Sequence, residues 1–185
     1  AQRYFKGNGV DQDEKTGVQL LHLAAEQNHA HACNMLGCLY RDGRHGTRQN
    51  YKKAAEWFQR AAQQGDCLAQ YYLGVMYLHG RGVRKDGDKA VELIGRAADQ
   101  GHAPSFRDLG NIYRDGNLVT KDEGKAAEWF RRGADKGFRD CQYALGLLYR
   151  DGDGVPKDKE KAAEWFRKAA DLGHKEAKMD LELLK

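Results

Sequence analysis

The chain repeats itself every 36 or 37 residues, and this period constrains its fold more than any other feature. The string Ala-Ala-Glu-Trp-Phe occurs at 54–58, 126–130 and 162–166. The pair Leu-Gly recurs in step with it, and a tyrosine stands three residues after each glycine. These pairs are Leu36-Gly37, Leu73-Gly74, Leu109-Gly110 and Leu145-Gly146. Periods of 20–50 residues are typical of proteins built from stacked supersecondary units, so the sequence predicts a repeat protein.

Each repeat has the pattern of two helices. Apolar residues of the first helix follow the i, i+4, i+7, i+8 spacing of one buried face, as in Ala32, Leu36, Leu39 and Tyr40. The second helix is predicted to bury Ala54, Trp57, Phe58 and Ala61. One such pair cannot bury both of its faces, so neighbouring pairs must stack. The expected fold is all-α, with antiparallel helix pairs stacked at a period of about 36 residues.

Glycine and aspartate mark the ends of the expected helices. The 22 glycines fall largely into three columns: one inside the first helix, one in the turn after it, and one after the second helix. The last column, which suits the left-handed residue that follows a helix, is Gly65, Gly101, Gly137 and Gly173. Asp86, Asp122 and Asp158 are predicted N-caps of second helices. Glycine inside a helix is unfavourable, so Gly37 and its equivalents are expected where two helices pack closely.

Charge and cysteine content argue against several classes of protein. Lysine and arginine total 31 against 27 acidic residues, for a net charge of +4, and the two signs alternate along the chain. A nucleic-acid-binding protein usually concentrates its basic residues into a stripe or tail, so no nucleic acid is expected as a partner. No apolar run is long enough to span a membrane. The cysteines, none in a CxxC pair, are expected to be buried thiols: Cys33, Cys38, Cys67 and Cys141.

The sequence divides into one partial repeat, four full repeats and a final helix within a single predicted solenoid, 1–185. Residues 1–29 hold the end of a first helix at Ala1–Phe5 and a second helix around Glu14–Gln27, so the chain is expected to begin inside a repeat of a longer protein. The segments are 1–29, 30–66, 67–102, 103–138, 139–174 and a capping helix 175–185. Neither the compartment, whether periplasm, cell envelope or cytoplasm, nor the oligomeric state follows from these features.

This pattern resembles the Sel-1-like repeat family, which is related to tetratricopeptide repeats, and the resemblance covers essentially the whole chain. Repeat 67–102 departs from the pattern at Leu93, where tryptophan is expected, and the turn of repeat 30–66 has one extra residue and lacks the Gly-Val pair. The residues of repeat 139–174 that carry the resemblance are Leu145, Gly146, Tyr149, Gly152, Gly154, Val155, Asp158, Lys161, Ala162, Trp165, Lys168, Ala169, Ala170, Gly173 and His174. The resemblance implies a right-handed α-solenoid that acts as a protein-binding adaptor, common in bacteria.

In a stacked array of helix pairs, the first helices tend to line the concave groove, and residues opposite their buried stripe should face it. These columns change in residue type between repeats while the core columns do not. The candidate partner-binding residues are Asn34, Arg41, Tyr71, Leu78, Arg107, Asn111, Arg114, Tyr143 and Arg150. Their arginines predict a basic wall suited to another protein or an acidic peptide. Alternatively, arginines that end exposed helices interact with the helix dipole and bind nothing.

Other candidate sites have a simpler structural interpretation. The recurring Trp57, Trp129 and Trp165 could stack on a ligand, but core packing is the favoured interpretation. The histidines His22, His29, His31 and His45 could hold a metal, yet they lack ligand spacing and are expected at turns and surfaces. Asp151-Gly-Asp-Gly is read as the turn between two helices, because the rest of a calcium loop is missing.

No nucleophile, phosphate-loop or metalloprotease motif is present. The sequence therefore predicts a non-catalytic interaction scaffold with no cofactor and no metal. An immunity protein that neutralises a secreted toxic effector, a cell-envelope hydrolase and a spacer within a larger solenoid are the alternatives.

Overall fold

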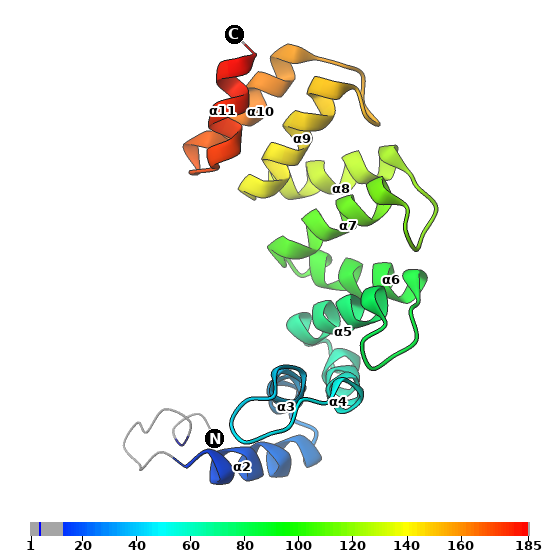
Figure 1. Cartoon of the computed structure of the whole chain (residues 1–185), viewed down its shortest axis with the longest axis vertical. Helices are drawn as coiled ribbons and strands as arrows, with labels where there is room; N and C mark the ends of the chain where they lie inside the picture. Colours follow the sequence, from blue (N-terminus) through cyan, green and yellow to red (C-terminus); the bar gives the residue numbers. More distant parts are fainter. Residues whose placement is uncertain (1–3, 5–12, 185) are drawn as a thin grey trace. The chain divides into compact units, whose positions relative to one another are not determined.

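The structure, a computed structural model, describes Tyr4 and residues 13–184, which contain ten α-helices (Figure 1). Short and long connections alternate along the chain, as expected for a series of helix pairs. The helices are α2 (Glu14–Glu26), α3 (Ala30–Asp42), α4 (Tyr51–Gln63), α5 (Cys67–His79), α6 (Gly87–Asp99), α7 (Ala103–Asp115), α8 (Glu123–Asp135), α9 (Arg139–Asp151), α10 (Lys159–Asp171) and α11 (Lys175–Leu183). The predicted second helix at Glu14–Gln27 is therefore present as α2. The helix end predicted at Ala1–Phe5 lies outside the described residues except for Tyr4.

The chain forms two compact units, unit 1 (Ala1–Gln100) and unit 2 (Gly101–Lys185). In unit 1, α3 pairs with α4 and α5 pairs with α6, while α2 packs on α3 and α4 packs on α5. In unit 2, α7 pairs with α8 and α9 pairs with α10, while α8 packs on α9 and α10 packs on α11. The expected all-α fold of stacked consecutive helix pairs is confirmed. The right-handed superhelix stays a prediction.

The predicted helix ends are confirmed in the structure. Asp86, Asp122 and Asp158 each accept a hydrogen bond from a backbone N–H three residues on, at 2.8–3.0 Å, and Asn50 does the same for α4. The glycines after α4, α6, α8 and α10 have a positive φ, for example 84° at Gly65, a conformation that glycine adopts without strain, and Asn28 takes this place after α2. These local signals set where each helix begins and ends.

The helix glycines allow close packing, as predicted, and the residue that fills the space is a phenylalanine in three of the four repeats. Phe58, Phe130 and Phe166 are fully buried. A methyl group added at Gly37 would lie 2.5 Å from the ring of Phe58. The equivalent methyl group at Gly146 would lie 2.6 Å from the ring of Phe166. The missing side chain therefore makes room for the aromatic ring of the partner helix.

The tryptophans are less buried than predicted. Trp57, Trp129 and Trp165 are only half-buried. A cation one helical turn further on covers each ring, with Arg132 4.1 Å from the centre of Trp129 and Lys168 3.9 Å from that of Trp165. The neighbouring phenylalanine, one residue later in the same string, carries the core position instead.

All four cysteines are free thiols, with Cys33 and Cys141 buried and Cys38 and Cys67 half-buried. Burial raises the pKa of the Cys141 thiol to about 12, so this group stays protonated at neutral pH. No helix in residues 13–184 is both long enough and apolar enough to cross a membrane.

Candidate functional site

The nine sequence-predicted partner-binding residues all lie on first helices of the two units. Unit 1 carries Asn34 and Arg41 on α3, and Tyr71 and Leu78 on α5. Unit 2 carries Arg107, Asn111 and Arg114 on α7, and Tyr143 and Arg150 on α9. All of these side chains except Asn34 are half-buried, so they present part of their surface to solvent.

Several of these residues contact the next first helix of the same unit. The guanidinium of Arg41 lies 4.4 Å from the centre of the Tyr72 ring on α5. Arg107 on α7 donates to Asp140 on α9 at 3.2 Å, and the hydroxyl of Tyr143 donates to Asp180 on α11 at 3.0 Å. The predicted columns therefore follow the first helices of each unit, and Arg41, Arg107 and Tyr143 also contact the next helix of the same kind.

Asn34 is an exception, because it is only 4% exposed. Residues 32–34 of α3 are all buried, so the buried face of this helix is wider than the single stripe expected from the sequence. The reason is that α3 is contacted by three other helices, α2, α4 and α5. Asn34 presents too little surface to take part in partner recognition in this conformation.

The predicted basic wall is largely neutralised by neighbouring carboxylates. Arg41 donates to Asp42 at 2.7 and 3.1 Å, and Arg150 donates to Asp151 at 2.8 Å through two nitrogens. Arg114 donates to Asp115 at 3.0 Å. Hydrogen bonds from the arginines hold the pKa of the Asp42 and Asp151 carboxyls below their ordinary value. A carboxylate of a partner would have to compete with these internal pairs.

One pocket of unit 2 includes a predicted residue. It has a volume of about 380 Å³ and lies at the start of α7 and α9. Most of the side chains that line it are apolar: Ala103, Pro104, Phe138, Cys141 and Leu172. The charged residues of the lining are Arg107, Arg139 and Asp140.

A second pocket, in unit 1, was not expected from the sequence. It has a volume of about 540 Å³ and lies under the turn 43–50 that joins α3 to α4. Its lining is mostly polar and consists of Tyr40, Gly46, Thr47, Arg48, Gln49, Asn50 and Lys53. The sequence signal that could have revealed it is the extra residue of this turn together with its uninterrupted basic charge.

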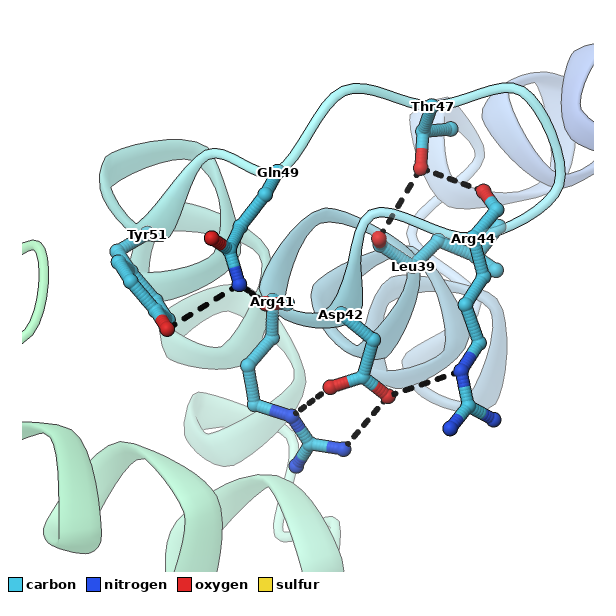
Figure 2. Close-up of polar contacts among 7 residues, drawn as sticks. All are labelled: Leu39, Arg41, Asp42, Arg44, Thr47, Gln49 and Tyr51. Carbon is cyan, nitrogen blue, oxygen red and sulfur yellow. Dashed lines mark hydrogen bonds and ion pairs between the residues drawn. The ribbon is translucent and has the colours of Figure 1, made fainter.

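Side-chain hydrogen bonds hold this turn in shape (Figure 2). The hydroxyl of Thr47 lies 3.0 Å from the carbonyl oxygen of Leu39 and 2.6 Å from that of Arg44. The amide nitrogen of Gln49 donates to the carbonyl oxygen of Arg41 at 2.8 Å and to the hydroxyl of Tyr51 at 3.2 Å. The turn is therefore fixed on both sides of Arg48, which lines the pocket between the two anchoring residues.

The histidines predicted to be turn or surface residues do not come together. His22 Nε2 lies 3.2 Å from the hydroxyl of Tyr40, and its ring meets that of Trp57 edge-on at 5.6 Å. His45 Nδ1 lies 2.8 Å from Glu14 Oε1 on α2. No group of three histidine, cysteine or acidic side chains suited to a metal occurs in the part of the chain that the structure describes.

The fold and these surfaces define a helical repeat scaffold that presents variable side chains on a constant core. The chain belongs to the Sel1 repeat family, whose model matches residues 1–29, 30–66, 67–102, 107–138 and 139–174. It is 49% identical over 53 residues to HRD3B, an ERAD-associated E3 ubiquitin-protein ligase component of Arabidopsis thaliana. This match covers 29% of the chain and only 9% of the length of that relative.

Solved structures of bacterial proteins share the fold over nearly the whole chain. A Sel1 repeat protein from Oxalobacter formigenes is 32% identical, with a TM-score of 0.89 over 95% of this chain and 72% of that chain. The protective antigen c5321 of uropathogenic Escherichia coli is 36% identical, with a TM-score of 0.86 over 97% of this chain and 38% of that chain. The immunity protein PA5088 from Pseudomonas aeruginosa is 25% identical, with a TM-score of 0.53 over 86% of this chain and 58% of that chain.

Proposed function

We propose that this chain is a non-catalytic scaffold that binds another protein, or an acidic peptide, on the exposed side of its first helices. The observation that carries the proposal is the contrast between columns. The buried column of Leu36 is leucine in all four full repeats, at Leu36, Leu73, Leu109 and Leu145, whereas the half-buried column of Cys38 changes to Val75, Asn111 and Leu147. A surface that varies on a constant core supports recognition of one particular partner.

The chemistry of the exposed columns suits a protein surface. Arginine, tyrosine and asparagine combine contact area with directional hydrogen bonds, and tyrosine and arginine are enriched among residues that dominate binding energy. The arginine–aspartate pairs orient each guanidinium while leaving part of it exposed, as at Arg114, whose side chain is 42% exposed. The pocket beside Arg107 adds a place for an apolar side chain.

The test is capture of partners from the native cell, with mass spectrometry of the bound proteins, using two matched variants. The first variant, Leu78→Glu with Asn111→Glu, places two charges on first helices. The control, Gln19→Glu with Gln63→Glu, adds the same charge on exposed positions of the second helices α2 and α4. We expect one partner to be lost from the first variant and kept by the control, with unchanged circular dichroism. Loss from both variants, or from neither, would contradict the assignment to the first helices.

A role as an immunity protein is the second candidate, and the similarity to PA5088 is the observation that favours it. An immunity protein must form a tight complex with a toxic effector and rescue growth. Co-expression with the product of the neighbouring gene tests this directly, because growth should recover only when both proteins are made. Toxicity that persists in the presence of this chain would reject the role for that gene pair.

A further inference from the structure

The turns that join the two helices of each repeat, taken together with the first three residues of the second helix, differ in charge between the units. Residues 43–53 of unit 1 contain four basic residues and no acidic one, and residues 80–89 contain four basic and two acidic residues. The equivalent segments of unit 2 are balanced, with two of each sign at 116–125 and three of each sign at 152–161. The basic excess of these turns is therefore confined to unit 1.

The two basic segments of unit 1 lie side by side. The guanidinium of Arg81 lies 5.8 Å from the centre of the Tyr51 ring, and a methyl group at Gly82 would collide with the carbonyl of Tyr51. We call the surface formed by residues 43–53 and 80–89 the basic loop edge. Contact between the two segments brings their positive charges to one region of the surface of unit 1.

One difference between the repeats removes a negative charge from this edge. In three repeats the N-cap of the second helix is an aspartate, whose carboxylate also lies 3.0–3.5 Å from a lysine ammonium one turn on: the pairs are Asp86–Lys89, Asp122–Lys125 and Asp158–Lys161. In repeat 30–66 the N-cap is Asn50, which accepts from the backbone N–H of Lys53 at 3.0 Å like its counterparts. Asparagine and aspartate cap helices about equally well. The helix start is therefore kept while one negative charge is removed.

The consequence is that two cations face the 540 Å³ pocket without a carboxylate. Lys53 lies over the ring of Tyr40, 5.3 Å from its centre, as the other three lysines lie over their tyrosines. Unlike them, neither Lys53 nor Arg48 forms an ion pair with a carboxylate among the described residues. Asp42, the last residue of α3, is shared between Arg41 and Arg44 (Figure 2), and Glu14 of α2 lies 2.8 Å from His45 of the turn.

We propose that the basic loop edge binds carboxylates of an acidic segment of a protein partner, with Arg48 and Lys53 as the contacts inside the pocket. The inference rests on the proposed function for the kind of partner and adds a second contact region to the first helices. Discrete carboxylates fit this edge better than a continuous phosphate backbone, because Asp86 and Asp88 interrupt its positive charge. Lys53 and Arg81 lie 5.3 and 5.8 Å from the ring centres of Tyr40 and Tyr51, where they would compete with a stacking base for one face of each ring.

Titration calorimetry with an octaglutamate peptide at low salt tests the proposal. Arg48→Gln with Lys53→Gln removes two charges from the basic loop edge. Lys121→Gln with Lys125→Gln removes two from unit 2, where both lysines are already paired with carboxylates. We expect the first variant to bind about tenfold more weakly and the control to bind like the unmodified chain, since two exposed ion pairs are lost only in the first. Thermal melting confirms that both variants are folded.

Three outcomes would overturn the proposal: no binding by the unmodified chain, an equal loss in both variants, or unchanged binding by the first variant. Duplex DNA of matched charge serves as the competing probe, and tighter binding of DNA than of octaglutamate at the same residues would assign the edge to nucleic acid instead. Partner capture separates this proposal from the function itself. If the Leu78→Glu, Asn111→Glu variant loses its partner while Arg48→Gln, Lys53→Gln keeps both partner and peptide, the scaffold function stands and the basic loop edge does not.

Discussion

The turn 43–50 in unit 1 and the turn 152–158 in unit 2 occupy the same place in their repeats but differ in what they leave exposed. Each follows a first helix that ends in a left-handed glycine, with φ of 67° at Gly43 and 87° at Gly152, and each ends in an N-cap. The turn 152–158 closes with Asp158 and its ion pair to Lys161. The turn 43–50 closes with Asn50 and leaves Lys53 without one. The fold therefore requires a capping side chain at this position, which either asparagine or aspartate supplies, but it does not require a negative charge. The charge of the cap can therefore differ between repeats and affect binding.

The largest expected effect is a loss of stability, and it tests whether a buried phenylalanine forms the core of the repeats in both units. Phe58→Ala in unit 1 and Phe166→Ala in unit 2 remove equivalent buried rings, and each should lower the free energy of unfolding by about 3–5 kcal/mol because a cavity is left behind. Urea denaturation followed by circular dichroism measures both. A loss under about 1 kcal/mol in either variant would show that the ring is not the core of its repeat.

The next effect concerns the glycines that face those rings. Gly37→Ala and Gly146→Ala each place a methyl group about 2.5–2.6 Å from the facing phenylalanine, so the rings must shift. We expect each change to cost about 1–3 kcal/mol, although alanine is the better helix former. A stabilised variant in the same denaturation experiment would show that helix propensity outweighs the close contact.

Much of this architecture could be predicted from sequence because its signals are local. N-caps, left-handed glycines and helix periodicity depend on a few adjacent residues, and all three were placed correctly. The choice between Trp57 and Phe58 as the core residue could not be made, because adjacent positions on a helix both fit an apolar face of this width. The burial of Asn34 depends on three helices that surround α3.

The candidate site was predicted less completely than the fold. Arg41, Arg114 and Arg150 are each followed by an aspartate in the sequence. Because each arginine pairs with that aspartate, the surface is less basic than the arginines alone indicate. The pocket under the turn 43–50 depends on hydrogen bonds of Thr47 and Gln49 to backbone atoms of neighbouring residues. Such contacts have no periodic signal. The extra residue of the turn, its basic charge and the replacement of the aspartate column by Asn50 were the sequence clues to this pocket.

A smaller effect separates the cap itself from its charge. Asn50→Ala removes the side chain that accepts from the N–H of Lys53, and it should destabilise the protein by about 1 kcal/mol. Asn50 also lines the pocket, but peptide binding should fall less than in Arg48→Gln with Lys53→Gln, because no charge changes. Thermal melting and octaglutamate titration on the same sample give both values, and a loss of binding without a loss of stability would reverse this assignment.

Acid should weaken the two caps of unit 2 and spare the cap of α4. Hydrogen bonds from the backbone N–H groups of Lys125 and Lys161 hold the pKa of the Asp122 and Asp158 carboxyls below its ordinary value. A carboxyl with a lowered folded pKa stabilises the protein above its unfolded pKa of about 4, and this contribution disappears as the pH falls through the folded pKa. Asn50 does not titrate.

Hydrogen–deuterium exchange, corrected for the intrinsic effect of pH, measures this difference at the first amides of each helix. On acidification from about pH 6 to pH 3, protection should fall at the start of α8 and α10 and remain at the start of α4. Equal loss of protection at all three helix starts would show that acid opens the repeats as wholes and does not act through the caps.

The most direct test exchanges the charge of the two caps. Asn50→Asp gives Lys53 the carboxylate that the other repeats have, whereas Asp158→Asn removes it from Lys161, and both residues remain good N-caps. Octaglutamate affinity should fall severalfold in Asn50→Asp with thermal stability nearly unchanged, because one exposed carboxylate now competes for the pocket. Unaltered affinity in Asn50→Asp, or an equal fall in Asp158→Asn, would contradict the account of the basic loop edge as the acidic-segment binding site.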